Sequence, residues 1–252
     1  MNLVLKSYSV TWASILMALA IAGVRAESTT QPATDPSLKA PFTVGSLLAS
    51  DDFNKDLTNW SSELEKGGKV QLRDGAMEID VPGGCTVWFS QKFDSPVMIE
   101  YDATVVGEGG PNDRVSDLNC FWMARDSRSP DDVLATKRSG KFSDYNLLKC
   151  YYVGVGGNGN TTTRFRRYIG DTEVRPLLPE HDLRDRADMI TANVPQRIRL
   201  VAAGKLIQFY RDDHRMFDLN DAEPYASGWF AIRTTSNHML VRHFRVHRLV
   251  PK

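Results

Sequence analysis

Residues 198–210 read IRLVAAGKLIQFY, and this stretch indicates how the chain folds. Hydrophobic and other residues alternate in Ile198–Val201 and again in Leu206–Tyr210, which is the pattern of a β-strand with one buried face. Ala203 and Gly204 lie between the two runs, and glycine permits a tight turn there. The stretch therefore predicts a β-hairpin, which joins two antiparallel strands.

Short runs of β-branched and aromatic residues, bounded by Gly, Pro, Asn or Asp, continue along the chain from residue 41. No long run has the period of an amphipathic helix, and only residues 178–192 suit one or two helical turns. About a dozen strands without alternating helices predict an all-β fold, an antiparallel β-sandwich or jelly roll, with a barrel as the alternative. The clearest runs are 77–81, 86–89, 97–102, 119–123, 147–155, 161–169, 197–201, 206–211, 229–234 and 239–249.

The N-terminal segment differs from the rest in composition. Residues 1–26 combine Lys6, an apolar run and the ending Val24-Arg25-Ala26, which is typical of a signal peptide. The apolar run is short and poorly flanked for a membrane span, and an uncleaved anchor is the alternative. Residues 27–40 are polar and contain proline, as in a disordered tether. We expect a secreted or periplasmic protein without a membrane span in its mature form, with residues 41–252 as a single β-sandwich domain.

The charge balance and the cysteine content limit the classes of function that are expected. Without residues 1–26, which contain Lys6 and Arg25 and no acid, 29 basic residues face 31 acidic ones, a net charge of −2. This balance lacks the basic excess of a nucleic-acid-binding domain, so no nucleic-acid partner is expected. The three cysteines have no metal-type spacing, and an odd number permits one disulfide and a free thiol, or three thiols. For a domain of this size we favour buried thiols.

A polar and cationic strip is predicted in residues 158–168, NGNTTTRFRRY. Side chains alternate along a strand, and Phe165 and Ile169 mark the buried face, which they share with Thr163 and Arg167. The opposite face then carries two guanidinium groups, a phenol and a hydroxyl, which suit hydroxylated or carboxylated sugars. A solvated face paired with acidic neighbours is the alternative. The residues of this opposite face are Thr162, Arg164, Arg166 and Tyr168.

The glycine-rich segment before this strip reads GVGGNGN at 154–160. It leads into a strand and not into a helix N-terminus, so its glycines indicate left-handed turns and not a phosphate loop. Asn158 and Asn160 are candidate sugar-binding amides in this segment.

A second candidate region surrounds the polar loop 107–117, because loops of that length are often functional. Arg114 and Asn119 stand beside acidic residues and are followed by an aromatic run that contains Trp122. An aromatic ring can hold one face of a sugar while polar groups bind its hydroxyls. We therefore include these three residues as candidate binding residues, with a core tryptophan under a structured loop as the alternative for Trp122.

The candidate catalytic residues are Tyr168, His238 and Arg166. Histidine as base, tyrosine as acid and arginine neutralising a uronate carboxylate are the groups that β-elimination requires. A structural histidine at a strand end is the alternative. Glu100 and Asp102 share a strand face about 6 to 7 Å apart, near the roughly 5 to 5.5 Å between the carboxyl groups of retaining glycosidases. Solvent-facing alternation is the simpler explanation for that pair.

Together these motifs resemble the DUF6250 family of exported bacterial proteins with a domain of unknown function. The resemblance covers roughly residues 50–249. It implies a concanavalin A-like (lectin/glucanase) β-sandwich that takes part in the breakdown of complex plant or algal polysaccharides. The segments that carry it are DRVSDLN at 113–119, FWMA at 121–124, YYVG at 151–154, GGN at 156–158, NTTTRFRRY at 160–168 and TTSNH at 234–238.

The sequence departs from the glucanases of this fold class in one respect. Relatives that resemble laminarinases carry a second glutamate soon after a Glu-x-Asp pair, whereas here Glu108 comes too late after Glu100 and Asp102 to share their strand face. A retaining hydrolase would then lack one of its two carboxylates, so the glucanase activity is not transferred.

No cofactor or metal is predicted. The five histidines form neither a His-x-Glu nor an HExxH arrangement. Sandwiches of the concanavalin type often hold calcium, but the acidic loop 113–117 lacks the Asp-x-Asp-x-Asp pattern of a calcium loop.

Three functions are consistent with these residues. The first is a secreted carbohydrate-active protein, a polysaccharide lyase or glycosidase that acts on a complex, uronate-containing polysaccharide or oligosaccharide. The second is a non-catalytic carbohydrate-binding module. The third is a structural or protein-interaction sandwich. The first two share a carbohydrate ligand, and they differ in whether titratable groups converge in one groove.

Overall fold

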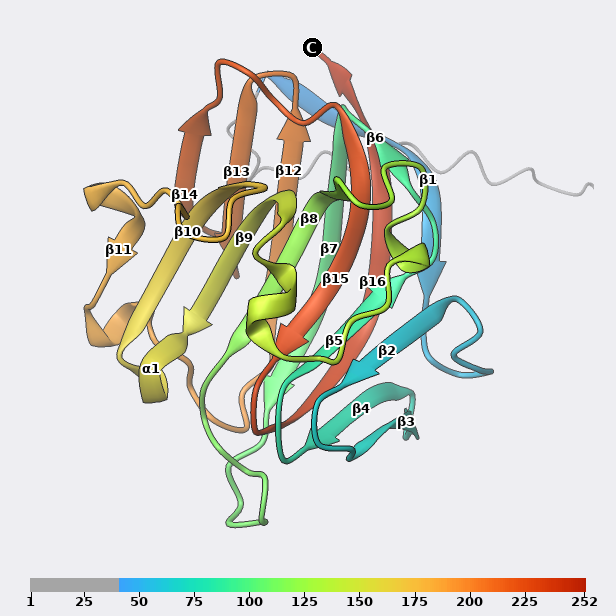
Figure 1. The fold of residues 1–252 in the computed structure, drawn as a ribbon, viewed down its shortest axis with the longest axis vertical. Helices are drawn as coiled ribbons and strands as arrows, with labels where there is room; N and C mark the ends of the chain where they lie inside the picture. Colours follow the sequence, from blue (N-terminus) through green and yellow to red (C-terminus); the bar gives the residue numbers. More distant parts are fainter. Residues whose placement is uncertain (1–40) are drawn as a thin grey trace, which may run out of the picture. The chain divides into compact units, whose positions relative to one another are not determined.

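The structure, a computed structural model, describes residues 41–252, so the predicted signal peptide at 1–26 and tether at 27–40 lie outside the described residues. Two antiparallel sheets pack against each other (Figure 1). In the first sheet, β1 is not part of the continuous series of neighbouring strands but pairs with β16. That sheet consists, in spatial order, of β14 (His214–Asn220), β13 (Leu206–Arg211), β12 (Gln196–Ala203), β7 (Val97–Val105), β16 (Asn237–Pro251), β4 (Ala76–Val81) and β3 (Lys69–Arg73), with β1 (Phe42–Asp51).

The second sheet lies in front of the first in Figure 1. It consists of β11 (Asp182–Leu183), β10 (Thr162–Ile169), β9 (Leu148–Gly156), β8 (Leu118–Asp126), β15 (Ser227–Thr234), β5 (Cys85–Phe89) and β2 (Trp60–Leu64), with β6 (Phe93–Asp94) paired to β15. Helical segments are short: α1 (Gly157–Asn160) and the 3-10 turns η1 (Val133–Ala135), η2 (Phe142–Tyr145), η3 (Pro179–His181) and η4 (Arg186–Asp188). Two sheets with open edges exclude the barrel alternative and confirm the predicted β-sandwich.

The hairpin that residues 198–210 predict is formed by β12 and β13, with Leu200 opposite Phe209 and Ala203 opposite Leu206. Its turn consists of Gly204 and Lys205, one residue later than expected. Gly204 has a φ of +58°, a left-handed conformation that glycine adopts without a steric cost.

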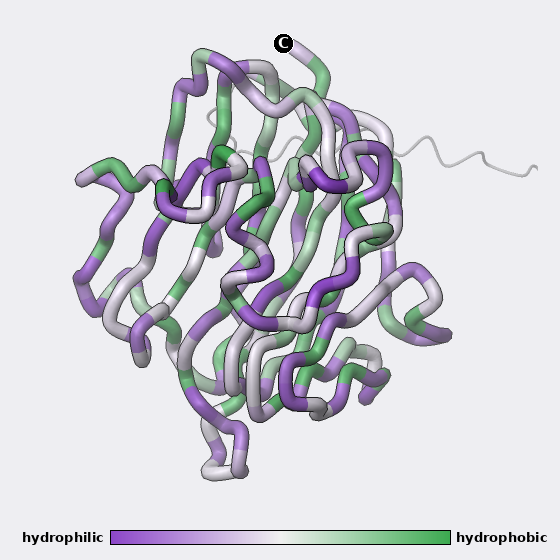
Figure 2. The backbone as a smooth tube through the Cα atoms, viewed as in Figure 1, coloured by the Kyte–Doolittle hydropathy of each residue, from purple (hydrophilic) through white to green (hydrophobic). Residues whose placement is uncertain are grey.

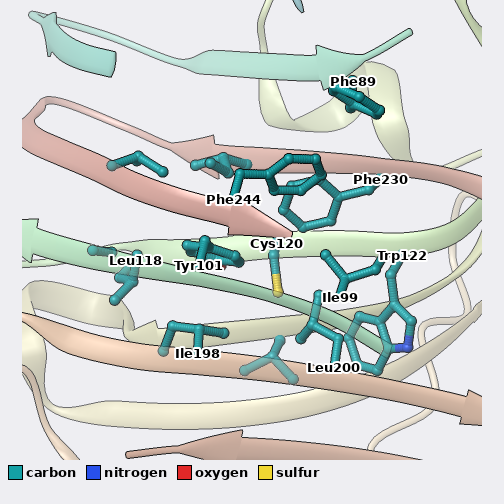
Figure 3. Packing of buried hydrophobic residues seen from close by; sticks show 14 of the residues in the cluster. Phe89, Ile99, Tyr101, Leu118, Cys120, Trp122, Ile198, Leu200, Phe230 and Phe244 are labelled. Atoms are coloured by element: carbon teal, nitrogen blue, oxygen red, sulfur yellow. The ribbon is translucent and has the colours of Figure 1, made fainter. Parts of the chain in front are cut away.

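The main core lies between the sheets, because every second residue of each long strand points to the other sheet (Figure 3). Tyr101 and Leu200 come from the first sheet and Phe230 from the second, and all three are at most 2% exposed. Figure 2 shows the resulting alternation of hydrophobic and hydrophilic residues along the strands. Such burial of large apolar side chains contributes about 1.5 to 3 kcal/mol for each of them.

Local predictions outside the strands also hold. Residues 178–192 contain the short turns η3 and η4. Asn158, Gly159 and Asn160 all have positive φ, so the glycine-rich segment forms left-handed turns as expected. Cys85, Cys120 and Cys150 are free and buried. Among residues 41–252 no helix has the length and apolar character needed to cross a bilayer.

Candidate functional site

Strand β10 positions the candidate site. Phe165 points between the two sheets, where its ring centroid lies 5.8 Å from that of Trp122. Because side chains alternate along a strand, the even-numbered residues of β10 lie on the outer face of the second sheet, away from the first. One pocket on that face is lined by all four residues of the predicted strip, so the predicted alternation is confirmed. These residues are Thr162, Arg164, Arg166 and Tyr168.

This pocket, called the groove below, has a volume of about 420 Å³, which is in the range of sites for one small ligand. It extends across β8, β9 and β10, and loop residues line it at both ends of these strands. The remaining lining residues are Asp117, Asn119, Phe142, Tyr152, Gly154, Gly157, Asn158, Arg175 and Thr235.

The strand register places polar side chains side by side across the groove. Asn119 on β8 lies opposite Gly154 on β9, and Gly154 lies opposite Arg164 on β10. The next row places Tyr152 opposite Arg166. A Cβ atom on Gly154 would lie 2.6 Å from the Tyr152 hydroxyl and 3.1 Å from Asn119 Oδ1, so the glycine keeps the floor of the groove open.

Two buried polar atoms in the groove have no hydrogen-bond partner among the described residues. They are Asn119 Oδ1 and the Tyr168 hydroxyl, and the two residues are only 2% and 1% exposed. Burying such an atom without a partner costs about 1 to 3 kcal/mol. Burial raises the pKa of Tyr168 to about 12, and the nearby Arg175 and Arg166 oppose this rise. Both atoms are therefore suited to bind hydroxyl groups of a ligand.

The groove has an excess of positive charge at one end. Arg164 is neutralised, because its Nε and Nη2 donate to the Asp182 carboxylate at 2.8 and 3.2 Å. Arg166 instead donates to the backbone carbonyl of Arg175, and Arg175 donates to Asn146 Oδ1 at 3.4 Å. Within residues 41–252 no carboxylate lies within ion-pair distance of Arg166 or Arg175. Burial, together with the neighbouring Arg175 and Arg164 cations, lowers the pKa of Arg166.

The opposite end of the groove contains its carboxylate, Asp117. The Asp117 Oδ2 atom accepts hydrogen bonds from the hydroxyls of Ser116 and Thr235 at 2.7 Å each. Arg114 donates to the same atom at 3.1 Å. Arg114, a predicted binding residue, thus holds Asp117 in place and does not itself line the groove.

Residues 79–244 match the family described as a domain of unknown function, DUF6250, and all residues of the groove lie within this range. The chain belongs to the DUF6250 family. A search of curated proteins found no match for this DUF6250 chain.

Solved structures similar to this DUF6250 domain share its fold at low sequence identity. A Bacillus subtilis protein of unknown function with a galectin-like fold superposes with a TM-score of 0.66 at 17% identity, covering 84% of this chain and 100% of its own. The carbohydrate binding module CBM66 from Bacillus subtilis gives 0.51 at 12% identity, with 76% and 96% covered. An endo-beta-1,3-glucanase from Pyrococcus furiosus gives 0.50 at 11% identity, with 84% and 96% covered. The domain therefore has the galectin-like, concanavalin A-like jelly-roll fold.

His238 lies outside the groove, and its predicted place beside Tyr168 and Arg166 is wrong. It belongs to β16 of the first sheet, and its Nδ1 and Nε2 contact Asp113 Oδ1 at 2.8 Å and Glu78 Oε1 at 3.0 Å. Burial lowers the pKa of His238, but the hydrogen bonds with these two carboxylates outweigh it, and the net pKa is raised. These two contacts agree with the structural alternative for this histidine.

The His238 contacts predict a pH-dependent stability. Because the folded-state pKa is raised above its ordinary value of 6.5, the stabilisation is fully present below that pH and is lost as the pH rises through the folded value. We expect His238→Gln to lower the free energy of unfolding more at pH 5.5 than at pH 9. Urea unfolding of both proteins across this range measures the difference. A difference that stays constant with pH would contradict the ionic contact.

Two other predicted binding residues lie outside the groove. Trp122 is fully buried between the sheets and does not reach the groove, because it shares a face of β8 with the core residue Cys120. Asn160 exchanges two hydrogen bonds of 2.9 Å with the backbone of Ile190 and lies outside the groove. Asn158 does line the groove, and its amide donates to the Thr162 hydroxyl at 3.1 Å.

The groove does not contain the two neighbouring carboxylates of a glycosidase. Its carboxylate, Asp117, lies opposite Gly156 on β9, whereas Tyr168 at the other end of the groove lies opposite Cys150 on the same strand. Six residues of β9 separate these positions, so Asp117 and Tyr168 are about 20 Å apart along the strand. Among the described lining residues Asp117 is the one carboxylate. Retaining and inverting enzymes hold their carboxyl groups about 5 to 10 Å apart.

The acid pair considered from the sequence is also remote from the groove. Glu100 and Asp102 lie on β7 of the first sheet, on the face opposite the core residues Ile99 and Tyr101. Asp102 accepts a hydrogen bond of 2.7 Å from the exposed His243. Within residues 41–252 there is no group of three or more His, Cys, Asp or Glu arranged to hold a metal ion.

Sequence reasoning did not identify Tyr152, Gly154, Phe142 or Arg175 as site residues. Tyr152 and Gly154 alternate with core residues of β9. The period of two residues along this strand could therefore have placed them on the same outer face as the predicted strip. Phe142 and Arg175 belong to irregular segments without periodicity, and no signal in the sequence marks them.

Proposed function

We propose that this DUF6250 domain binds an acidic, uronate-containing oligosaccharide or polysaccharide in the groove. The observation that carries the proposal is the pair Arg166 and Arg175, two guanidinium groups without a carboxylate partner beside the unpartnered Tyr168 hydroxyl. The likeness in fold to a carbohydrate binding module and to a glucanase supports a carbohydrate ligand.

The chemistry of the groove fits such a ligand at both ends. Guanidinium groups bind a carboxylate with paired, charge-assisted hydrogen bonds, so Arg166 and Arg175 suit the uronate carboxylate. Asn119 Oδ1 and the phenols of Tyr152 and Tyr168 suit sugar hydroxyls, which both donate and accept. The Arg175 guanidinium lies over the ring of Phe142, 5.8 Å from the ring centroid.

Replacement of Arg166 by alanine tests the charged end of the groove. A hydrogen bond to a charged group is worth about 1.5 to 3 kcal/mol, so we expect affinity for polygalacturonate, alginate or glucuronan to fall about 10- to 100-fold. Isothermal titration measures the change. The matched control is Arg215→Ala on β14 of the first sheet, where the side chain is 44% exposed, and it should leave the affinity unchanged.

The carboxyl-reduced form of the same polysaccharide provides the second control. It should bind wild type more weakly than the acidic form, and it should bind wild type and Arg166→Ala equally. Equal affinity of both proteins for the acidic form would show that Arg166 does not bind the uronate carboxylate, and it would contradict the proposal.

β-Elimination of a uronate glycan is a second candidate, favoured by the position of the Tyr168 phenol beside two guanidinium groups. In that reaction a base removes the proton beside the carboxylate, the glycosidic C–O bond breaks, an acid protonates the leaving oxygen, and a carbon–carbon double bond remains. His238 does not supply the base, and burial raises the pKa of Tyr168 to about 12, so its phenol is protonated at pH 7. Any lyase activity of Tyr168 should therefore increase steeply with pH.

Two assays on the same glycans separate catalysis from binding. Absorbance of unsaturated chain ends reports elimination, and new reducing sugar reports cleavage of any kind. If the protein binds a glycan but gives neither signal from neutral to alkaline pH, the enzyme hypothesis is wrong and the domain is a binding module.

Export by a signal peptide at residues 1–26 is part of the proposal, because an extracellular glycan is then accessible to the domain. N-terminal sequencing of the protein recovered from the periplasm or the medium tests it, with a mature chain expected to begin after Ala26. Recovery of the intact chain in the cytoplasm would contradict it.

A further inference from the structure

The outer face of the second sheet is divided into two halves. One half carries the groove, and residues 127–147 between β8 and β9, called the strap below, cover the other half (Figure 1). Val133 and Tyr145 of the strap are fully buried there against Trp88 on β5 and Phe121 on β8. The ring centroids of Phe121 and Tyr145 lie 5.6 Å apart in a stacked arrangement. The strap is thus packed on the sheet as a second apolar core.

The strap ends the groove abruptly on the β15 side. The row that contains Arg164, Gly154 and Asn119 continues to Arg233 on β15, and Arg233 is only 1% exposed. Its guanidinium donates to the carbonyl oxygen of Gly140 in the strap. Arg233 and the strap backbone therefore form an end wall next to Asn119.

The strap lies too close to the sheet for a glycan to pass beneath it. A Cβ atom on Gly84 would lie 2.2 Å from the carbonyl oxygen of Gly140, and one on Gly140 would lie 2.5 Å from the amide nitrogen of Glu65. Backbone therefore meets backbone at this point, and only glycine permits the approach. The contact is anchored by Arg138, whose side chain is 0% exposed and forms ion pairs with Glu63 and Asp126.

The groove occupies only part of the width of the sheet. Seven strands from β11 to β2 span about 29 Å, whereas the groove crosses β8 to β10, about 10 Å. On the other side the sheet ends at β11, where Asp182 binds Arg164 and also Arg184, whose side chain is 63% exposed. In the direction across the strands, a bound chain can therefore leave the groove over this edge but not past the strap.

We infer that the groove receives the end of an acidic glycan chain, with the strap as the wall that excludes internal chain segments. This inference rests on the proposed function. A dead-ended groove holds the terminal residues of a chain, and the rest of the chain leaves across β11 past Arg184. An open cleft would instead bind at many positions along one polymer.

Stoichiometry with chains of different length tests the inference on the wild-type protein. Polygalacturonate, alginate and glucuronan are each separated into size classes from short oligosaccharides to long polymer, and each class is titrated calorimetrically. Chain-end binding predicts one protein per chain at every length, with an affinity per chain end that does not change beyond the shortest classes. A number of bound proteins that rises in proportion to chain length would overturn it.

The Arg166→Ala variant separates failure of this inference from failure of the proposed function. Loss of binding in this variant places the ligand in the groove, and the stoichiometry then decides between chain end and internal segment. Binding that persists in the variant, or no binding of wild type to any of the three glycans, overturns the proposed function and the inference with it.

Discussion

Replacement of Arg138 by methionine is expected to lower the free energy of unfolding by about 3 to 5 kcal/mol, the cost of removing one partner from a buried ion pair. Arg138 forms ion pairs with Asp126 and with Glu63, where the Nη1–Oε1 distance is 3.2 Å. The same Glu63 carboxylate accepts hydrogen bonds from the Tyr145 hydroxyl at 2.6 Å and from Trp88 Nε1 at 3.0 Å. Without the guanidinium, Glu63 keeps two neutral donors and loses its cation.

A neighbouring arginine provides the matched control. Arg128 binds the same Asp126 at 2.7 Å, but its side chain is 39% exposed. The Asp126 carboxylate is fully buried and keeps its ion pair with Arg138 when the partly exposed Arg128 is removed, so Arg128→Ala should lower the free energy of unfolding less than Arg138→Met does. Urea unfolding at pH 7 measures both variants. Equal and small losses would show that the ion pairs of Arg138 do not hold the strap on the sheet.

The fold was predictable because the long strands carry their own signal. Each of the ten runs identified from composition and alternation corresponds to a strand, since one buried face imposes a period of two residues. Strands at the edges escaped because they bury little: neither the ten-residue β1 (Phe42–Asp51) nor β3 (Lys69–Arg73) has a fully buried residue. The order of strands within each sheet depends on contacts between residues far apart in sequence, which periodicity does not report.

The candidate site was predictable in part: Asn119 and Asn158, predicted as binding residues, line the groove together with the outer face of β10. Phe165 established the buried face of β10, and the four residues of the opposite face followed from alternation alone. His238 could not be placed in this way, because its strand belongs to the other sheet and its face cannot be related to that of β10 from sequence. Gly154 was interpreted as part of a turn, whereas its importance comes from Tyr152 and Asn119, which approach it in space.

This glycine gives the second large prediction: Gly154→Ala should abolish most ligand binding while the domain stays folded. The added methyl group would lie 2.6 Å from the Tyr152 hydroxyl, which is closer than contacts allow, and 3.1 Å from Asn119 Oδ1, which is a tight contact. Both polar groups must move, and the methyl group then occupies the floor between them. Each hydrogen bond to the ligand that is lost costs about 0.5 to 1.5 kcal/mol, so displacement of both groups should lower the affinity about 10- to 100-fold, measured by titration with the acidic glycan that binds wild type.

The double variant Gly154→Ala with Tyr152→Phe separates the effect on binding from an effect on folding. Loss of the Tyr152 hydroxyl removes the closer of the two contacts, so the double variant should recover the melting temperature that the single variant loses. Its affinity should stay low, because the methyl group still covers the floor of the groove and one phenol is gone. If Gly154→Ala binds as tightly as wild type, the ligand does not contact the β9 floor, and the polar row of Asn119 and Arg164 has no part in recognition.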